Sequence, residues 1–250
     1  MPVVEDADRT TLVLPFYDEA ARLDLGALQR LAGSSLDLVL VDDGSTDDTR
    51  ALLAGFLTGA PGTLLTLDVN AGKGEAVRRG LLAALDAGAD LVGYADSDLA
   101  SPVEEILRVA TLARDARDLD VLLGSRLKLA GRLMQRRATR HYLGRVIATY
   151  IDTRTRLGVY DTQCGLKFLR ASPELRAALA RPFATRWLFD VELLRRLRIE
   201  HAASGRPLRM REEPLETWVD VAGSRISRGE LLRVARDFVL LERSMRDSGA

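Results

Sequence analysis

Short apolar runs rich in β-forming residues alternate with segments of helical spacing along the first hundred residues. Strands are expected at 10–15, 36–41, 63–69 and 91–95, and helices at 19–31, 49–57 and 75–87. Such alternation favours a parallel, doubly wound sheet, because each strand must return to the same edge through a helix that covers one face. The sequence therefore predicts an α/β fold with a single Rossmann-like, mostly parallel sheet flanked by helices.

The second half of the chain is less regular. It predicts helices at 102–114, 173–180 and 190–198, a strand at 121–124, and a long basic segment after that strand. No internal repeat, low-complexity tract or Pro/Ser-rich linker separates the two halves. We therefore expect one domain over 10–240, with residues 10–100 and 101–240 as its two lobes.

Polar side chains follow three predicted strands of the first half at the point where each strand ends. They are Asp42, Asp43, Asn70, Lys73, Asp96 and Asp98. In doubly wound sheets ligands bind beyond the carboxyl ends of the strands, so these groups should gather at one rim. This rim is the predicted binding site.

The acidic triplet Asp96-Ser97-Asp98 is the strongest single signal at this rim. Two carboxylates on a tight turn can hold a hard divalent cation, Mg²⁺ or Mn²⁺, against a diphosphate. The alternative is a solvated turn that caps the helix expected at 102–114. A lone D-x-D pattern is common, so its context must decide.

Three further turns of the first half admit both a binding and a capping role. Asp42-Asp43-Gly44 could accept hydrogen bonds from a base or ribose, or cap the following helix. The Pro15–Glu19 segment could border a base, or staple and cap a helix. In the Asn70–Gly74 segment, two glycines and Lys73 could approach a phosphate, but the P-loop and dinucleotide fingerprints are missing.

A basic segment follows the strand expected at 121–124. No acidic residue lies between Asp120 and Asp152, whereas the basic residues are Arg126, Lys128, Arg132, Arg136, Arg137, Arg140 and Arg145. Interleaved apolar residues make the segment amphipathic, as expected where a chain meets anionic headgroups or a lipid phosphate. An ordinary solvated helix face is the alternative, and RNA binding is a weaker third interpretation.

Charge and cysteine content exclude several classes of protein. The 36 basic and 36 acidic residues cancel, so no overall field favours nucleic acid as a partner. A single cysteine, Cys164, excludes an internal disulfide and a thiolate zinc site and fits a reducing cytoplasm. Residues 1–9 are acidic, and no stretch approaches the ~18 apolar residues of a membrane span. We expect a cytoplasmic protein, soluble or peripheral at the membrane's cytoplasmic face, in contact through 126–147.

Together, and in this order, the segments resemble family-2 glycosyltransferases of the dolichyl-phosphate hexose synthase type. Leu14–Glu19 resembles their V-P-x-Y-N-E opening, Val41–Thr49 their V-D-D-G-S-x-D-x-T, Asn70–Gly74 their N-x-G-K-G and Asp96–Asp98 their D-A-D. Gly124–Arg126, Asp161–Phe168, Trp187–Glu192 and the stretch from Trp218 to Arg225 continue the likeness. The last three resemble the dolichyl-phosphate glucosyltransferase branch.

The resemblance implies a GT-A fold and an inverting transfer of a hexose to a polyprenyl or dolichyl phosphate. The implied donor is a nucleotide sugar, with UDP-glucose favoured and GDP-mannose as the alternative. Donor-binding residues would be Pro15, Tyr17, Glu19, Asp42, Asp43, Lys73 and Asp96, with Mg²⁺ or Mn²⁺ held by Asp96 and Asp98. Catalytic residues would be Asp98, Asp161 and Arg126, and acceptor-binding residues Arg126, Arg137, Arg140, Asp190 and Glu192.

Three positions depart from the family pattern. Asp18 replaces the usual Asn, and Glu75 stands where a small residue is common. Ala100 lies where the mannosyl branch has a metal-facing Gln, which argues against a mannose synthase. Asp190 and Glu192 are two residues apart, so on a helix at most one should point into a site.

Other functions are compatible with parts of the pattern. The same fold could act on a soluble saccharide or small metabolite, with Asp161 as a general base if that acceptor were an alcohol. A non-catalytic nucleotide-sugar sensor or a peripheral membrane adaptor could retain the fold. The sequence lacks the Gly-rich signature of a nucleotidyltransferase and that of an NAD enzyme, which argues against both.

Overall fold

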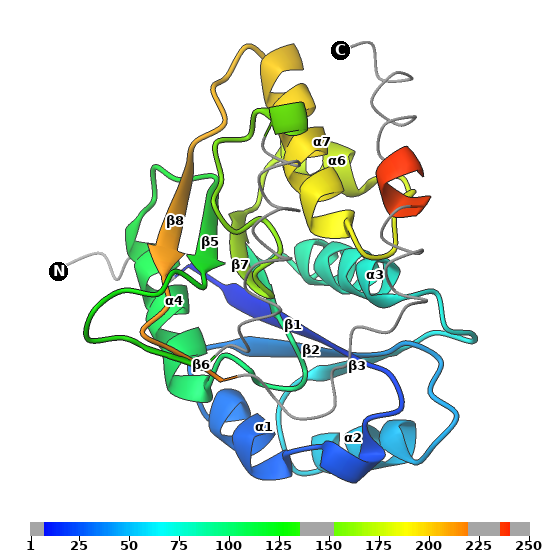
Figure 1. Cartoon of the computed structure of the whole chain (residues 1–250). Helices are drawn as coiled ribbons and strands as arrows, with labels where there is room; N and C mark the ends of the chain where they lie inside the picture. Colours follow the sequence, from blue (N-terminus) through cyan, green and yellow to red (C-terminus); the bar gives the residue numbers. More distant parts are fainter. Residues whose placement is uncertain (1–7, 136–152, 220–235, 241–250) are drawn as a thin grey trace, which may run out of the picture.

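A seven-stranded sheet forms the centre of the molecule (Figure 1). The computed structural model describes residues 8–135, 153–219 and 236–240. The strands are β1 (Thr10–Phe16), β2 (Asp37–Asp42), β3 (Thr63–Thr66), β4 (Leu91–Ala95), β5 (Val121–Ser125), β7 (Leu166–Arg170) and β8 (Met210–Pro214), in the order β3-β2-β1-β4-β7-β5-β8. Only β7 runs antiparallel to its neighbours, β4 and β5. The expected α/β fold with a mostly parallel sheet is confirmed.

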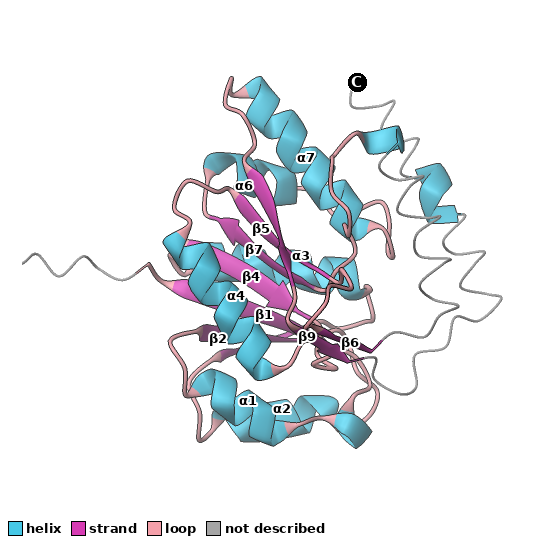
Figure 2. Ribbon diagram, turned by 60° about the vertical axis from the view of Figure 1, so that its left-hand side comes forward, coloured by secondary structure: helices cyan, strands magenta, loops and turns pink. Residues whose placement is uncertain are grey.

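Helices cover both faces of the sheet (Figure 2). They are α1 (Leu25–Ala32), α2 (Thr49–Leu57), α3 (Lys73–Asp86), α4 (Val103–Asp115), α6 (Pro173–Leu179) and α7 (Phe189–Ala203). The alternation of side chains along β1 shows the two layers, because Leu12 and Leu14 pack with α1 and α4 while Val13 packs with α3. The helices α3, α6 and α7 share one face, and α1, α2 and α4 share the other.

Helix α3 lies close against the sheet because Gly80 faces β1 and β2. A Cβ at this position would lie 2.3 Å from Val13 Cγ1 and 2.9 Å from Val41 Cγ2, closer than real Cβ atoms come to such neighbours. The missing side chain therefore lets the helix approach the strands. This places Lys73, the first residue of α3, at the edge where β4 ends.

One expected helix and one expected strand differ from the structure. The helix expected at 19–31 is divided into a short 3-10 helix, η1 (Ala20–Arg22), and α1, because the Asp24 side chain accepts a hydrogen bond from Ala27 N and starts a new helix there. The strand expected at 63–69 ends at Thr66, and Val69 is 72% exposed.

Four strands were not anticipated from the sequence: β6 (Leu133–Gln135), β7, β8 and β9 (Thr217–Val219). Strands β6 and β9 form a separate parallel pair. Strand β8 is an edge strand with the charged sequence MREEP, which lacks an apolar pattern. Within the described ranges, no helix is long and apolar enough to cross a bilayer.

Candidate functional site

A cleft of about 620 Å³ lies at the rim where β1, β2 and β4 end. Its lining residues are Pro15, Phe16, Tyr17, Glu19, Asp43, Asn70, Gly72, Lys73, Ser97, Ala184, Arg186, Trp187, Arg236, Asp237 and Leu240. The first half of the chain contributes turns that follow the parallel strands. The second half contributes the loop before α7 and the segment 236–240. The rim predicted from the sequence is thus a physical cleft with a second wall.

Asp43 ties two turns of the first wall together. Its carboxylate oxygens accept hydrogen bonds from the backbone N–H groups of Ala71 and Gly72, each at 2.8 Å. Burial raises the pKa of Asp43 above its ordinary value, although these two amides act in the opposite direction. The side chain therefore fixes the turn after β3 while lining the cleft.

Asp42 has a different environment from its neighbour. It is fully buried, and its oxygens accept from Ser45 N at 3.2 Å and Arg50 Nε at 2.8 Å. Arg50 also donates to the Leu67 carbonyl at 3.2 Å, which joins α2 to the end of β3. Of the two adjacent aspartates, Asp43 lines the cleft and Asp42 stabilises the turn between β2 and α2.

The end of β1 and the segment after it supply three expected donor-binding residues to the cleft wall: Pro15, Tyr17 and Glu19. Tyr17 is 42% exposed, so its ring is available to a ligand. Asp18, which replaces the family's usual Asn, has φ +49° and accepts from Thr46 N at 2.7 Å. A carboxylate that caps a neighbouring turn thus holds the strained backbone beside Tyr17.

Asp96 and Asp98 lie directly after β4. Lys73 Nζ forms an ion pair with Asp96, and Asp98 accepts from Ala100 N at 3.1 Å. Burial and the nearby charge of Asp96 raise the pKa of Asp98. Leu99, the next residue, has φ +52°, an uncommon conformation for a non-glycine residue that shapes this turn.

The two aspartates fit a divalent cation. The Asp96 and Asp98 carboxylates repel each other, and both are attracted to the Lys73 ammonium. Their oxygens are the hard ligands that Mg²⁺ and Mn²⁺ prefer. Among the residues that the structure describes, no group of three His, Cys, Asp or Glu side chains could hold a metal. The remaining ligands would therefore come from substrate oxygens or water.

Gly165 leaves room for the Asp96 carboxylate. A Cβ at residue 165 would lie 2.2 Å from Asp96 Cγ, so any side chain would displace the carboxylate. Gly165 belongs to the Asp161–Gly165 turn that precedes β7. This turn of the second half therefore contacts the turn at 96–98 of the first half directly.

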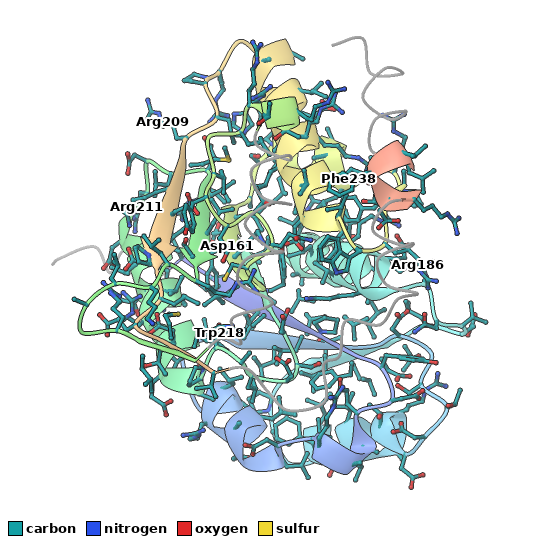
Figure 3. The ribbon with its side chains drawn as sticks, viewed as in Figure 1. Asp161, Arg186, Arg209, Arg211, Trp218 and Phe238 are labelled. Atoms are coloured by element: carbon teal, nitrogen blue, oxygen red, sulfur yellow. The ribbon has the colours of Figure 1, made fainter. Side chains whose placement is uncertain are left out.

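Arg126 and Asp161 form a partly buried bidentate ion pair. Arg126 donates from Nε and Nη2 to the Asp161 carboxylate, each at 2.7 Å, and from its backbone N at 3.0 Å. Burial opposes the charge of Arg126, but Asp161 raises its pKa above the ordinary value. The guanidinium carbon also lies 5.6 Å from the Trp218 ring centroid. These two expected catalytic residues thus bind each other; Asp161 is labelled in Figure 3.

Asp190 and Glu192 are both buried at the start of α7, and neither is among the residues that line the cleft. Asp190 accepts from the Tyr94 hydroxyl and from the fully buried Lys167 ammonium. Lys167 Nζ also donates to the Cys164 carbonyl at 2.5 Å. Burial and the Asp190 carboxylate raise the pKa of Tyr94 well above its ordinary value.

Glu192 organises the loop before α7. It accepts from Ala184 N and Thr185 N, each at 3.0 Å, and from Thr185 Oγ1 at 2.9 Å. Arg196 Nη2 donates to it at 2.7 Å. Asp190 and Glu192 thus have different partners inside the protein, and acceptor contact by either residue stays a prediction.

The sequence-based prediction missed the second wall of the cleft. Its residues are Ala184, Arg186, Trp187, Arg236, Asp237 and Leu240. Trp187 belonged to a recognised motif and is 41% exposed, so an exposed aromatic residue was an available signal. No local signal placed the segment 236–240 there. Arg137, Arg140 and most of the predicted membrane contact at 126–147 lie outside the described residues.

The sequence is similar to known glycosyltransferases over most of its length. Residues 11–174 match the family described as Glycosyl transferase family 2. A dolichyl-phosphate beta-glucosyltransferase of Dictyostelium discoideum is 30% identical over 241 residues, which cover 90% of this chain and 66% of that protein. A dolichyl-phosphate beta-glucosyltransferase of Drosophila melanogaster is 31% identical over 264 residues, which cover 96% of this chain and 77% of that protein.

The fold is also shared with a solved enzyme. A crystal structure of glucosyl-3-phosphoglycerate synthase from Mycobacterium tuberculosis, in complex with Mn²⁺, UDP and glucosyl-3-phosphoglycerate, matches with a TM-score of 0.67 at 19% identity. The match covers 94% of this chain and 78% of the other. Likeness at this identity shows the fold alone, and that fold is GT-A.

Proposed function

The chain belongs to glycosyl transferase family 2, and we propose that it transfers glucose from UDP-glucose to a polyprenyl phosphate, with inversion at the anomeric carbon. GDP-mannose is the alternative donor. Two relatives that match most of the chain are dolichyl-phosphate beta-glucosyltransferases, which supports both the sugar and the lipid phosphate. The structural observation that carries the proposal is the cleft that brings Asp43, Lys73 and the turn at 96–98 to one rim.

The nucleotide would bind along the first wall. Tyr17 offers an exposed aromatic face for a base, and Pro15 and Glu19 line the same part of the cleft. Asp43, held by the amides of Ala71 and Gly72, would accept from the nucleoside. Because these groups are fixed by the turns that carry them, little ordering would be needed when the donor binds.

Asp96 and Asp98 would hold Mg²⁺ or Mn²⁺ at the donor diphosphate. The cation, when bound, supplies positive charge that stabilises the departing nucleotide. Lys73 now pairs with Asp96, and the surrounding carboxylates raise its pKa although burial opposes this, so it stays charged. Its ammonium is therefore placed to share in neutralising the diphosphate, and Gly165 leaves room for the Asp96 carboxylate.

A phosphate acceptor is consistent with the state of Asp161. A phosphate monoester is ionised near neutral pH and needs no strong general base. An alcohol would need one, and the oxygens of Asp161 already accept three hydrogen bonds from Arg126. One phosphate oxygen would form the new bond to the anomeric carbon as the bond to the diphosphate breaks. Arg126, Arg137 and Arg140 are the proposed acceptor contacts.

The test is a transfer assay with a panel of donors and acceptors. Purified protein is incubated with radiolabelled UDP-glucose or GDP-mannose, Mn²⁺, and either a polyprenyl phosphate or soluble saccharides and phosphorylated metabolites. We expect label to enter the lipid from UDP-glucose. If label entered only a soluble product, the acceptor would be a soluble molecule and not a lipid phosphate. If transfer occurred only from GDP-mannose, the donor would be GDP-mannose and not UDP-glucose.

The control for this assay is Asp98→Asn, which removes one metal-binding charge with little change in volume. Transfer should be lost in this variant and in metal-free buffer. If neither donor supports transfer to any acceptor while binding persists, the chain is a nucleotide-sugar-binding protein and the proposed reaction is wrong.

A further inference from the structure

The loop between α6 and α7 forms part of the second wall, and its N-terminal side is held by a buried carboxylate. Glu192 is 2% exposed and accepts the backbone N–H groups of Ala184 and Thr185 together with the Thr185 hydroxyl. Arg196 Nη2 contacts the same carboxylate at 2.7 Å. Charge-assisted bonds from one side chain to consecutive amides leave this part of the loop little freedom.

The other side of the same loop is held by a second buried carboxylate, from a segment distant in sequence. Asp237 is 5% exposed and accepts from Trp187 N at 2.6 Å, with a weaker contact to Leu188 N at 3.4 Å. Leu188 is the N-cap position of α7, where an anionic acceptor is favourable. Phe238, which follows Asp237, packs against the hydrophobic core and lies on the same side of the molecule as Arg186 (Figure 3).

Arg186 lies between these two fixed points and projects over the first wall. Its Nη2 donates to the Asn70 carbonyl at 3.2 Å and to Asn70 Oδ1 at 2.9 Å. The contact needs Gly72, where a Cβ would lie 2.6 Å from Arg186 Nε. These hydrogen-bond acceptors are neutral oxygens, although the charge of Arg186 also favours the ionised form of the nearby Asp43 carboxylate. A planar, permanently charged group therefore lines the cleft and can bind an anion.

We propose that Arg186 is a phosphate-binding residue of the cleft, positioned by Glu192 and Asp237. The inference rests on the proposed function, because it assigns to that reaction a ligand contact in the second wall. Its ligand is a phosphoryl oxygen, either of the donor diphosphate or of the acceptor phosphate. Guanidinium groups form paired hydrogen bonds with such oxygens, and a loop fixed on both sides preserves their geometry.

The first experiment compares Arg186→Gln and Arg186→Lys with the wild type. Calorimetry with UDP and Mn²⁺ reports binding of the diphosphate, and initial rates at varied polyprenyl phosphate report the acceptor KM. We expect Arg186→Gln to raise one of the two constants by about tenfold to a hundredfold. Arg186→Lys should recover part of the loss. A higher Kd for UDP assigns the donor diphosphate, and a higher acceptor KM assigns the acceptor phosphate.

Arg209→Gln is the matched control, because Arg209 is exposed beside β8 on the opposite side of the molecule (Figure 3). It should change neither constant. If Arg186→Gln also changes neither constant while the wild type transfers glucose, the inference is wrong and the proposed function stands. If the wild type transfers nothing but Arg186→Gln weakens UDP binding, the proposed reaction fails and the phosphate contact stands.

The positioning role of Asp237 has its own test. Asp237→Ala should shift the same constant as Arg186→Gln by about threefold to tenfold, and Asp237→Asn should restore it because the amide oxygen can still accept from Trp187 N. In the double variant Asp237→Ala/Arg186→Gln the two effects should not add. A purely structural role would lower stability or the active fraction and leave Kd and KM unchanged, which would overturn the positioning role.

Discussion

The two walls of the cleft are built on different principles. In the first wall, side chains that follow consecutive parallel strands meet at the sheet edge, as Asp43 meets the turn after β3 and Lys73 meets Asp96. In the second wall, acidic side chains are buried beneath the surface, and they hold backbone amides of the loop before α7 in place.

This difference separates charge that faces a ligand from charge that supports the fold. Asp98 is partly exposed, and burial and its neighbour Asp96 raise its pKa. Asp190 and Glu192 are buried with hydrogen-bond partners inside the protein. Removing the charge of Asp98 should therefore impair function without harming stability, whereas removing the cation that pairs with buried Asp190 should strongly destabilise the fold.

The largest effect on stability is expected at the buried ion pair between Lys167 and Asp190, beneath the second wall. Lys167→Met would leave Asp190 buried without its cation, so the free energy of unfolding should fall by ~3–5 kcal/mol. Urea unfolding measures this. The double variant Lys167→Met/Asp190→Asn should recover at least half of the loss, since it removes the uncompensated charge. A loss under ~1 kcal/mol in the single variant would contradict the contrast between the walls.

Asp98→Asn should show the opposite behaviour. Loss of one of the two carboxylates proposed to hold the cation should lower the rate of sugar transfer by ~10²–10³-fold, because charge on the leaving diphosphate would no longer be fully stabilised. Initial rates at saturating Mn²⁺ and donor measure the change. Asp42→Asn is the comparison, since Asp42 is fully buried and pairs with Arg50, and it should affect stability more than rate.

Gly165→Ala tests the contact between the 161–165 turn and Asp96. The added Cβ would push the Asp96 carboxylate aside, so transfer should fall by about tenfold to a hundredfold and the Mn²⁺ requirement should rise. Gly55→Ala in α2 is the matched control, because nothing lies within 4 Å of a Cβ there. Unchanged activity in Gly165→Ala would mean that Asp96 need not hold its present position.

The smallest effect concerns the pH dependence of stability. The pKa of Asp98 is raised above its ordinary value of 3.8, so the folded protein binds this proton more tightly than the unfolded chain. The contribution of Asp98 to stability is therefore greatest at low pH and falls as pH rises from 3.8 through the raised pKa. Across this window, the free energy of unfolding of Asp98→Asn should rise by on the order of 0.5 kcal/mol relative to that of the wild type.

Urea unfolding of both proteins at a series of pH values without metal measures this gain. The stability difference between them should grow as pH rises through the window and then become constant. A variant less stable than wild type above the window would show that Asp98 supports the fold.

The first wall could be predicted from sequence because it depends on local order. Alternating strands and helices define a parallel sheet, and parallel strands place the turns at residues 43, 73 and 96–98 at one edge. The prediction could not separate Asp42 from Asp43, because the direction of each side chain depends on the turn between β2 and α2. Arg50, which pairs with Asp42, gave no sign of this role in the sequence.

The second wall could not be predicted in the same way because it depends on contacts between distant segments. Strand β7 inserts antiparallel between β4 and β5, and β8 pairs with β5 although its sequence is charged. Asp237 contacts the loop at Trp187 from fifty positions along the chain. An apolar pattern reveals buried strands and helices, but it does not reveal which buried carboxylate holds which loop.

Calorimetry of UDP-glucose binding tests the central claim, a metal-dependent nucleotide-sugar site in the cleft, most directly. Wild type and Asp98→Asn are titrated with UDP-glucose, with GDP-mannose in parallel, in the presence and absence of Mn²⁺. The structure predicts binding of UDP-glucose that requires Mn²⁺ in the wild type and is lost or strongly weakened in Asp98→Asn. Failure of the wild type to bind either donor, or equal binding by both proteins with and without metal, would contradict it.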